Sequence, residues 1–561
     1  MASSALKRLR AKDPGAGLLE HERGLYWTCV AIAAVPLLMV ERFPSQDGPV
    51  HLYIAYLMSR EIADASLRGV FMWNDAIEPN VLTYYLLRPL FSLVSPLTAE
   101  RLLVGLYWVS FAAAARYMSS AQRNGGVFAF LFLPFAFGFF IHLGFYNFSL
   151  GTVFYMALAG FALRRLANLD ASSLAVMAAG ALLLSITHVL PLMAWLVTIG
   201  MARGGLALQQ MVGPAPGSWR SVARSFIRDG SAIALVTSPA LFLAFSFALR
   251  HTGTEMEAGT PVIGIAKLLA YAATLSPVHG LSVSGAAIAL PYIVVVWTAT
   301  AAAVWTFYRQ PGSACDGLRL ILPLAGLTLA YLALNVGMKG FSAQERLLPF
   351  VFFLLFCLLA ASPAKDRIRR WIVFVMPLVV FASAADRAIF YRRAETLANQ
   401  YRAIGQHIER GSTFIGVNTS GRRDRIDGIS TGLRLNVVEH LGSLVAVERD
   451  LIGLSTGLIS TAGFGYFPIV YRPDKDPYIH LYPDNADYSI ARYVRETGVP
   501  VDYVLFWPSL IPSPMLSPLD VALTERLHHE VAGSGFRRVT PAVPNLDAVP
   551  LYARASEPSA Q

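Results

Sequence analysis

Long apolar segments recur along the first 390 residues of this chain, and they constrain its fold more than any other feature. A helix needs about 20 predominantly apolar residues to cross the hydrocarbon core of a bilayer. Only 15% of the residues are charged, whereas soluble domains carry about a quarter. The mean hydropathy of +0.50 agrees with this composition. The chain is therefore predicted to be a polytopic α-helical membrane protein.

Eleven spans are expected from these segments, at residues 24–40, 102–118, 127–141, 145–163, 172–187, 189–202, 231–249, 283–307, 318–335, 346–362 and 371–389. No small-residue cleavage site follows the first segment, so it is expected to be a retained anchor and not a signal peptide. The run 263–278 is short and carries Lys267, and it is expected to form an interfacial or re-entrant helix. The division at His188 is open, because one tilted helix over 172–202 is an alternative.

The basic residues predict the orientation of the spans. With residues 1–23 in the cytoplasm, the cytoplasmic pieces carry 18 Lys and Arg residues, counting Arg319 at a loop rim, and the short outer loops carry three. Positively charged residues accumulate on the cytoplasmic side of membrane proteins. This asymmetry favours a cytoplasmic N-terminus, and it favours the division at His188, since a single span there would invert every later loop. Eleven spans then place the C-terminus outside.

The residues after the last span are expected to form a separate domain. Residues 391–561 hold 17 Lys/Arg and 18 Asp/Glu, which leaves 29 and 18 for the preceding residues. The basic excess, a net of +11, therefore belongs to residues 1–390, which include the transmembrane domain (residues 24–390), where it sets topology and is no nucleic-acid footprint. The segments STFIGV, VDYVLFW and VPLYAR resemble strands and follow a helical stretch. A small extracytoplasmic α/β domain is predicted.

The first outer loop, residues 41–101, is long enough to be a structured unit. HLYIAYLMSREIADASLRG at 51–69 has the pattern of an amphipathic helix. EPNVLTYYLLRPLFSLVSPL at 78–97 is apolar and is expected to lie at the interface or dip into it. The loop is thus predicted to carry two juxtamembrane helices.

Unusual polar residues gather on the predicted outer side of the membrane. They are Gln46, Asp47, His51, Asn74, Asp75, His142, Tyr146, Asn147, His188, Lys339 and Arg346. Polar and ionisable groups at membrane depth are costly and therefore indicate a site.

Each of these residues also has a structural explanation. Asp47 lies in the turn sequence SQDGP, and His51 could cap or pair with it. Asn147 could cap a helix, and His188 could satisfy the backbone freed near Pro191. Arg346 could extend to lipid headgroups.

The three cysteines, Cys29, Cys315 and Cys357, lie far apart in or beside apolar segments. Their spacing fits neither a disulfide framework nor a zinc site, so buried thiols are expected.

The arrangement resembles the GT-C superfamily of integral-membrane glycosyltransferases, which includes protein mannosyltransferase-like and lipid A aminoarabinose transferase-like enzymes. The features that carry the resemblance are an acid soon after the first span (SQDGPVH), two juxtamembrane helices, and the segment EPNVLTYYLLRPL…SPLTAERLLVGLYW. The likeness is closest to bacterial members of unassigned substrate, which implies a location in the bacterial inner membrane.

The resemblance implies transfer of a sugar from a polyprenyl-phosphate donor to an extracytoplasmic acceptor, which could be an envelope glycan, a lipid or a protein. Asp47 would be the general base. Arg346, with Lys339 or His188, would bind the lipid phosphate. Gln46, His51, Asn74, Asp75, His142, Tyr146 and Asn147 would contact the sugar or its surroundings. Several relatives carry paired acids in this loop, whereas Asp47 stands beside Gln46 and Gly48. No cofactor is therefore expected, and a metal requirement is doubtful.

Two other function classes stay open at this point. A transporter or flippase predicts an internal repeat and polar residues near the bilayer midplane, and the sequence has neither. A non-catalytic assembly protein for envelope polysaccharide predicts that Asp47 and Arg346 are dispensable while residues 391–561 are not.

Overall fold

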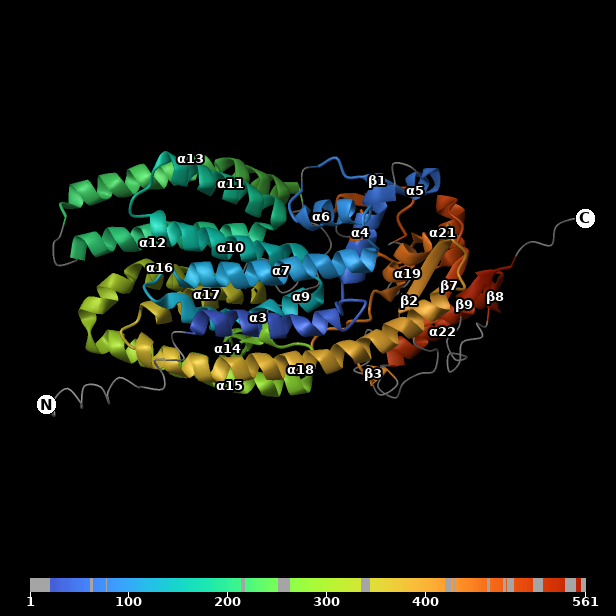
Figure 1. Ribbon diagram of the computed structural model, residues 1–561. Helices are drawn as coiled ribbons and strands as arrows, with labels where there is room; N and C mark the ends of the chain where they lie inside the picture. The colour runs from blue at the N-terminus through green and yellow to red at the C-terminus, as the bar shows by residue number, and fades with distance from the viewer. Residues whose placement is uncertain are drawn as a thin grey trace, which may run out of the picture.

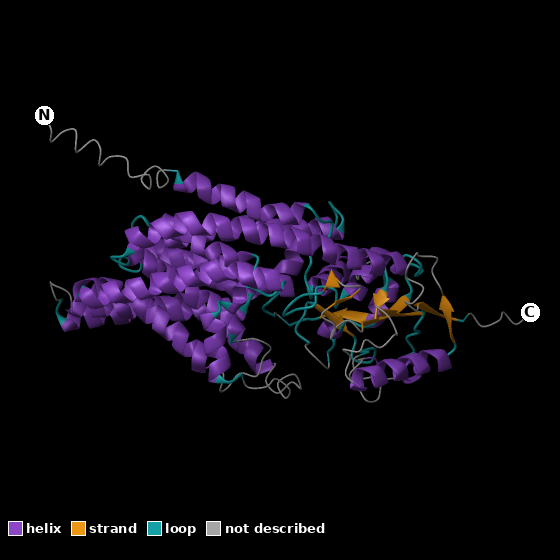
Figure 2. Ribbon diagram, turned by 90° about the horizontal axis from the view of Figure 1, so that it is seen from below, coloured by secondary structure: helices purple, strands orange, loops and turns teal. Residues whose placement is uncertain are grey.

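The computed structural model joins a bundle of long helices to a smaller region that contains a sheet (Figures 1 and 2). It describes residues 21–60, 64–76, 78–212, 217–250, 263–333, 344–418, 425–426, 429–461, 465–477, 481, 489–507, 518–539 and 551–555. The sheet lies at one end of the molecule and the helical bundle occupies the other (Figure 2).

Helices occupy all eleven predicted spans. They are α3 (Glu22–Leu38), α7 (Pro96–Ser119), the sequence η1 (Gly125–Phe132), α8 (Leu133–Ala136) and α9 (Phe139–Leu143), then α10 (Tyr146–Arg165), α11 (Ala171–Thr187), α12 (Val189–Val212), α13 (Trp219–Arg250), α15 (Val283–Arg309), α16 (Pro311–Ala333), η5 (Glu345–Leu347) with α17 (Leu348–Ala361), and α18 (Lys365–Gly405). Within the described residues, seven of these segments are long and apolar enough to cross a membrane. The total of eleven crossings and their direction stay predictions.

Burial separates inner from outer helices. The apolar window of residues 125–143 is 89% buried, whereas that of α13 is 22% buried. Leu235 and Phe242 of α13 project apolar surface outward, at 74% and 68% exposure. Apolar surface of this extent is stable only against lipid or another protein, so α13 has the surface of a lipid-facing helix.

The chain breaks between α11 and α12 at His188, as predicted. His188 has an extended backbone (φ −171°, ψ 132°), and its Nδ1 atom accepts a hydrogen bond of 3.1 Å from the Leu190 N–H. Pro191 lies in the first turn of α12, where a missing N–H costs nothing. The division into two helices is therefore confirmed.

The first outer loop contains α4 (Gly48–Arg60), α5 (Ala65–Val70), β1 (Phe71–Trp73) and α6 (Leu82–Leu90). The expectation of one amphipathic juxtamembrane helix over 51–69 is wrong. Every residue from Gly48 to Met58 is buried, because α4 packs between α6 and a helix of the C-terminal region (Figure 1). α6 agrees better with an interfacial helix, since Tyr85 is 53% exposed.

The run 263–278 folds as α14 (Ile265–Ala273) followed by η3 (Ser276–Val278). The nine residues of α14 extend only about 14 Å at 1.5 Å per residue. This helix is therefore too short to cross a bilayer.

The C-terminal region combines a mixed sheet with helices. Its elements are β2 (Thr413–Asn418), β3 (Arg425–Ile426), β4 (Ile429–Ser430), α19 (Leu441–Arg449), β5 (Ile452–Gly453), η6 (Gly457–Ile459), β6 (Ile469–Tyr471), α21 (Ile490–Thr497), β7 (Tyr503–Trp507), α22 (Pro518–Gly533), β8 (Phe536–Val539) and β9 (Leu551–Arg554). Five strands form a sheet of order β5-β2-β7-β9-β8, parallel from β5 to β7 and antiparallel beyond. The predicted α/β character and its three strand segments are confirmed.

Two connections join this region to the helical part. β1 of the first outer loop pairs antiparallel with β6, so that Phe71 lies opposite Tyr471. α18 continues without interruption past residue 390 and reaches the sheet (Figure 1). The expected domain boundary therefore falls within a continuous helix.

Candidate active site

The SQDG segment is held against the end of α9 by its backbone. The N–H groups of Gln46 and Asp47 donate to the carbonyl oxygens of His142 and Leu143, at 2.8 and 3.0 Å. Gly144 allows this approach: it has φ +94°, and a Cβ atom there would lie 2.6 Å from the Gly48 nitrogen. Other residues rarely adopt this conformation. The glycine therefore allows the Asp47 backbone to bind the end of α9.

A buried polar network supports the segment from behind. Arg42 is 3% exposed and donates to the carbonyl oxygens of Ser45 and Val437, at 2.8 and 2.7 Å. The Tyr146 hydroxyl lies 2.9 Å from Ser45 Oγ and donates to Glu100 Oε1 at 2.5 Å. Tyr146, a predicted sugar contact, is 2% exposed and here supports the loop that carries Asp47.

Asp47 immediately precedes α4. Its carbonyl oxygen accepts hydrogen bonds from the N–H groups of Val50 and His51, at 3.0 and 3.1 Å. Its carboxylate lies 3.3 Å (Oδ1) from Nε2 of His440, and the Asp47 side chain is 14% exposed. His440 immediately precedes α19 in the C-terminal region. The site is thus formed where the helical bundle meets that region.

The ionisation of His440 follows from this contact. Burial acts to lower its pKa, but the hydrogen bond to Asp47 and the negative charges of Asp47 and Glu439 outweigh burial and raise the pKa above its ordinary value. A protonated imidazole is therefore favoured beside the Asp47 carboxylate.

Arg346 belongs to the same group of charges. Electrostatic interactions link it to Asp47 and to Tyr466 of the C-terminal region. Its guanidinium packs over the Phe145 ring, 4.1 Å from the centroid, and its Nη1 atom lies 3.5 Å from His188 Nε2. Burial raises the pKa of Tyr466 to about 12; Arg346 opposes this shift and Asp47 adds to it. We refer to Asp47, His440, Arg346, His188 and Tyr466 as the polar centre.

The neighbour of Arg346 has a different partner. Glu345 is 3% exposed, forms an ion pair of 2.6 Å with Arg434, and accepts a hydrogen bond of 2.5 Å from Ser276 Oγ. Arg434 and Ser276 therefore bind the Glu345 carboxylate, and its negative charge is not left to repel a phosphate at Arg346. Lys339, the other predicted phosphate ligand, lies outside the described residues.

Two predicted histidines make buried hydrogen bonds. His51 Nδ1 lies 2.7 Å from the Tyr84 hydroxyl. Burial lowers the pKa of His51 to about 4 despite the opposing charge of Asp47, so its ring stays neutral at physiological pH. His142 is fully buried and lies 2.7 Å (Nε2) from the Tyr391 hydroxyl.

Asn147 connects α10 to the first outer loop. Its Oδ1 atom accepts from the Thr83 N–H at 2.8 Å, and its Nδ2 atom donates to the Asn80 carbonyl at 2.7 Å. The Thr83 hydroxyl is a third partner. These contacts use most of the hydrogen-bonding capacity of the amide.

The remaining predicted contacts lie along the boundary with the C-terminal region. Gln46 Oε1 accepts from the Asn436 N–H at 2.9 Å, and Asn74 Nδ2 donates to the Gly465 carbonyl at 3.0 Å. Asp75 is exposed. Gln46 therefore lies beside Asp47, whereas Asn74 joins the loop to the segment that carries Tyr466.

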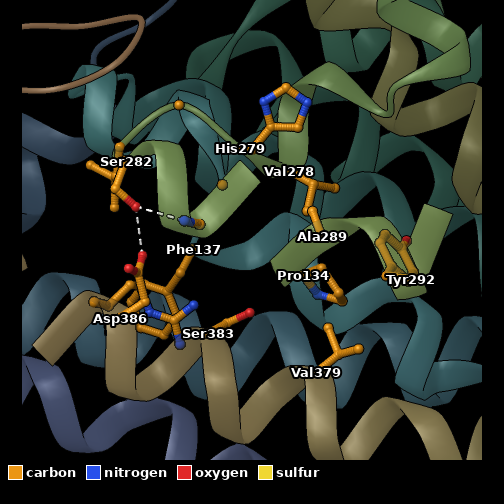
Figure 3. Close-up of a pocket in the computed structure, with 15 residues that line it drawn as sticks. Pro134, Phe137, Val278, His279, Ser282, Ala289, Tyr292, Val379, Ser383 and Asp386 are labelled. Carbon is orange, nitrogen blue, oxygen red and sulfur yellow. Dashed lines mark hydrogen bonds between the residues drawn. The ribbon is translucent and has the colours of Figure 1, made fainter. Parts of the chain in front are cut away.

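A separate cavity of about 50 Å³ lies between the η3–α15 connection and α18 (Figure 3). Asp386, at its edge, accepts hydrogen bonds from the hydroxyls of Ser282 and Ser284, at 2.7 and 2.5 Å. The acid thus binds the two serines at the start of α15, where Ser282 is the N-cap, and has no part in the polar centre. Nowhere in the described residues do three or more His, Cys, Asp or Glu side chains form a group able to hold a metal ion.

Comparison with known proteins gives structural matches only. No protein-family model and no curated protein matches the chain. The crystal structure of ArnT from Cupriavidus metallidurans bound to undecaprenyl phosphate matches with a TM-score of 0.51 at 10% identity, over 95% of this chain and 97% of that one. The chain has an ArnT-like fold. The apo structure of the same ArnT matches with a TM-score of 0.45 at 12% identity, over 95% and 98% of the two chains.

The ArnT-like fold confirms the GT-C-like architecture expected from the sequence. At 10% identity the likeness establishes the fold and assigns no residue a role. Of the polar centre, the sequence indicated Asp47, Arg346 and His188 but missed His440 and Tyr466. NVVEH and GYFP carry no local signal, because both segments gain their chemistry only by docking against the first outer loop.

Proposed function

We propose that the protein transfers a sugar from a polyprenyl-phosphate donor to a hydroxyl acceptor on the outer side of the bacterial inner membrane. The observation that carries this proposal is that Asp47 and Arg346, which are 299 positions apart, both pack against residues 143–145. The Asp47 N–H donates to the Leu143 carbonyl, and the Arg346 guanidinium lies over the Phe145 ring. The ArnT-like fold supports it, since that ArnT was crystallised with undecaprenyl phosphate.

In the proposed reaction the acceptor oxygen attacks the anomeric carbon of the donor sugar. The new carbon–oxygen bond forms as the bond to the phosphate oxygen breaks, and the electron pair leaves with the polyprenyl phosphate. The acceptor proton passes to Asp47. One negative charge therefore moves from the carboxylate to the phosphate, which needs cations near both groups.

Asp47 suits the role of the base because its position is fixed by the backbone of residues 142–144. His440 contacts Oδ1, so Oδ2 is the oxygen that receives the acceptor proton. A base must lie within hydrogen-bond reach of the proton that it takes.

Arg346 is the proposed phosphate ligand, with His188 beside it and Lys339 as a further candidate. A guanidinium matches phosphate geometry with two parallel donors, and Phe145 holds its plane in place. Gln46 is the proposed sugar contact nearest the base. His51, His142, Tyr146 and Asn147 would shape the surrounding wall through the contacts described above.

The test is sugar transfer by the full-length protein in liposomes, supplied with a panel of radiolabelled polyprenyl-phosphate sugars and candidate envelope acceptors. Removing a general base lowers rates by about 10²- to 10⁴-fold, so Asp47→Asn should lose at least two orders of magnitude. Arg346→Gln should weaken donor binding. Asp474→Asn and Arg472→Gln, which change an exposed pair, are matched controls that should keep full activity.

In this proposal Arg346 and His440 supply the positive charge near the phosphate and the carboxylate, and no metal is needed. Addition of a chelator should therefore leave the transfer activity unchanged. Activity that survives Asp47→Asn would remove the assigned base. Folded protein that transfers no sugar from any donor would overturn the proposed function and favour transport or assembly.

A further inference from the structure

We propose that the C-terminal region completes the active site by supplying a positioning residue, His440, whose Nε2–H donates to Asp47 Oδ1 and aims the other carboxylate oxygen at the acceptor. This inference rests on the proposed function. It gives residues 391–561 a role that the reaction chemistry alone does not require.

The segment that carries His440 is fixed to the residues that precede Asp47. Arg42, five residues before Asp47, donates to the Val437 carbonyl at 2.7 Å. Gln46, the residue just before Asp47, accepts from the Asn436 N–H at 2.9 Å. The two segments therefore contact each other at three points, of which the His440–Asp47 pair is the third.

The same segment also reaches the phosphate side of the centre. Arg434, six residues before His440, pairs with Glu345, the residue preceding Arg346. The N–H groups of Leu433 and Arg434 donate to the Gly280 carbonyl at 3.1 and 3.0 Å. Residues 433–440 thus contact the chain next to the proposed base, Asp47, and next to the proposed phosphate ligand, Arg346. Their docking therefore fixes the distance between Asp47 and Arg346.

The helix that follows His440, α19, is held against the helix that follows Asp47, α4. Tyr53 of α4 donates from its hydroxyl to the Leu451 carbonyl at 3.0 Å and accepts from the Gly453 N–H at 2.7 Å. α19 packs along α4. Because α4 begins next to Asp47 and α19 begins next to His440, this contact keeps the pair together.

The charges around His440 favour its protonated form. Asp47 and Glu439 lie beside it with negative charge, and neutral His51 lies nearby. The Asp47 charge also interacts with Arg346 and Tyr466. The His440 pKa lies above its ordinary value as a result. Loss of that proton at high pH removes the positive charge and allows Nε2 to become an acceptor, which would release Asp47.

The first measurement compares His440→Ala with His440→Gln in the transfer assay, with thermal stability recorded for both. Glutamine can place an N–H near the position of Nε2, whereas alanine cannot. Positioning predicts a fall in kcat of about 10- to 100-fold for His440→Ala, less than ten-fold for His440→Gln, and loss of the basic limb of the pH profile in His440→Gln. His407→Gln removes an exposed histidine and should behave like the wild type.

Two results would overturn the inference. Full activity in His440→Ala would show that Asp47 needs no such partner. A loss in His440→Gln as large as in His440→Ala, with both variants folded, would show that the imidazole itself takes the proton.

A second measurement separates this inference from the proposed function. The His440 imidazole can be titrated by NMR in histidine-labelled protein, with the signal assigned by its absence in His440→Gln. Its pKa should lie above the ordinary 6.5 in the wild type and fall in Asp47→Asn. An unchanged pKa in Asp47→Asn would overturn the coupling even if transfer is observed. A fall would support the coupling even if none of the donors tested is a substrate.

Discussion

Gly144 allows the close approach of the Asp47 segment because it has no side chain. Its φ of +94° is unfavourable for other residues, and an added Cβ would lie 2.9 Å from the Asp47 Cβ. Gly144→Ala is therefore expected to displace Asp47 and to lower transfer activity by 10-fold or more, with a loss of about 1–3 kcal/mol in the free energy of unfolding. Transfer kinetics and thermal unfolding in detergent would measure the two effects.

Gly200→Ala is the matched control, because a Cβ there meets nothing within 4 Å and Gly200 lies inside α12. Alanine favours a helix interior by about 1 kcal/mol over glycine, so this variant should be as stable as the wild type or more so. Normal activity in Gly144→Ala would show that the loop can place Asp47 without the glycine.

At the scale of single residues, the sequence indicated which groups are unusual but not what each contacts. Asp47 and Arg346 were predictable because charges beside apolar spans are costly. Tyr146 and Asn147 were equally conspicuous, yet Glu100 and the Asn80–Thr83 backbone bind their polar groups. His440 was missed because its role depends on a contact 393 positions away, which no local pattern encodes.

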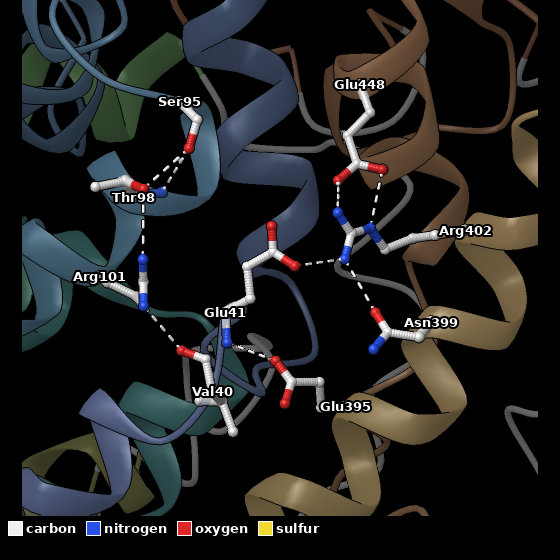
Figure 4. A network of polar contacts seen from close by, with 9 residues as sticks. All are labelled: Val40, Glu41, Ser95, Thr98, Arg101, Glu395, Asn399, Arg402 and Glu448. Carbon is white, nitrogen blue, oxygen red and sulfur yellow. Dashed lines mark hydrogen bonds and ion pairs between the residues drawn. The ribbon is translucent and has the colours of Figure 1, made fainter.

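At the scale of elements, α18 joins the helical bundle to the C-terminal region through a network of polar contacts near its end (Figure 4). Arg402 near its end bridges Glu448 of α19, at 2.7 Å, and Glu41 after α3, at 2.9 Å. Glu41 lies six residues before Asp47. The expectation is that Arg402→Gln increases hydrogen exchange in residues 41–47 and 441–449 and lowers stability by about 1 kcal/mol, since both charges lose their shared partner.

Arg492→Gln is the control for this variant. Arg492 pairs with Glu496 one turn along α21, and both side chains are more than 40% exposed, so its loss should change neither exchange nor stability measurably. Unchanged exchange around Asp47 in Arg402→Gln would mean that the other contacts between the two parts, such as the β1–β6 pairing and the packing of α4 on α19, hold them together without Arg402.

Elements with local causes were predicted correctly, and elements with distant causes were not. The break between α11 and α12 was favoured by the basic residues of the flanking loops, and the structure confirms it, with an extended His188 and with Pro191 in the first turn of α12. The segment 51–69 was expected at the membrane surface because apolar residues at 52, 54, 55, 57, 58, 62 and 65 oppose polar residues at 59–61 and 64. The burial of α4 depends on α19, which packs against it from the C-terminal region.

At the scale of the whole molecule, the proposal requires residues 391–561 and the polar centre to face the outside. The 18 basic residues of the predicted cytoplasmic pieces against three in the short outer loops make the opposite orientation unfavourable. Single cysteines can report it. Cys29, Cys315 and Cys357 are free thiols and would first be replaced by alanine.

In that background, Glu409→Cys should react with a membrane-impermeant maleimide in intact spheroplasts, and Arg220→Cys should react only after the membrane is permeabilised. Both positions are exposed, so a difference in labelling reports sidedness and not burial. Retained transfer activity would show that the substitutions leave the fold intact. Labelling of Arg220→Cys alone in intact cells would invert the topology and place the polar centre in the cytoplasm. Asp47 and Arg346 would then meet nucleotide sugars, and a donor carried on an outward-facing lipid phosphate would no longer be required.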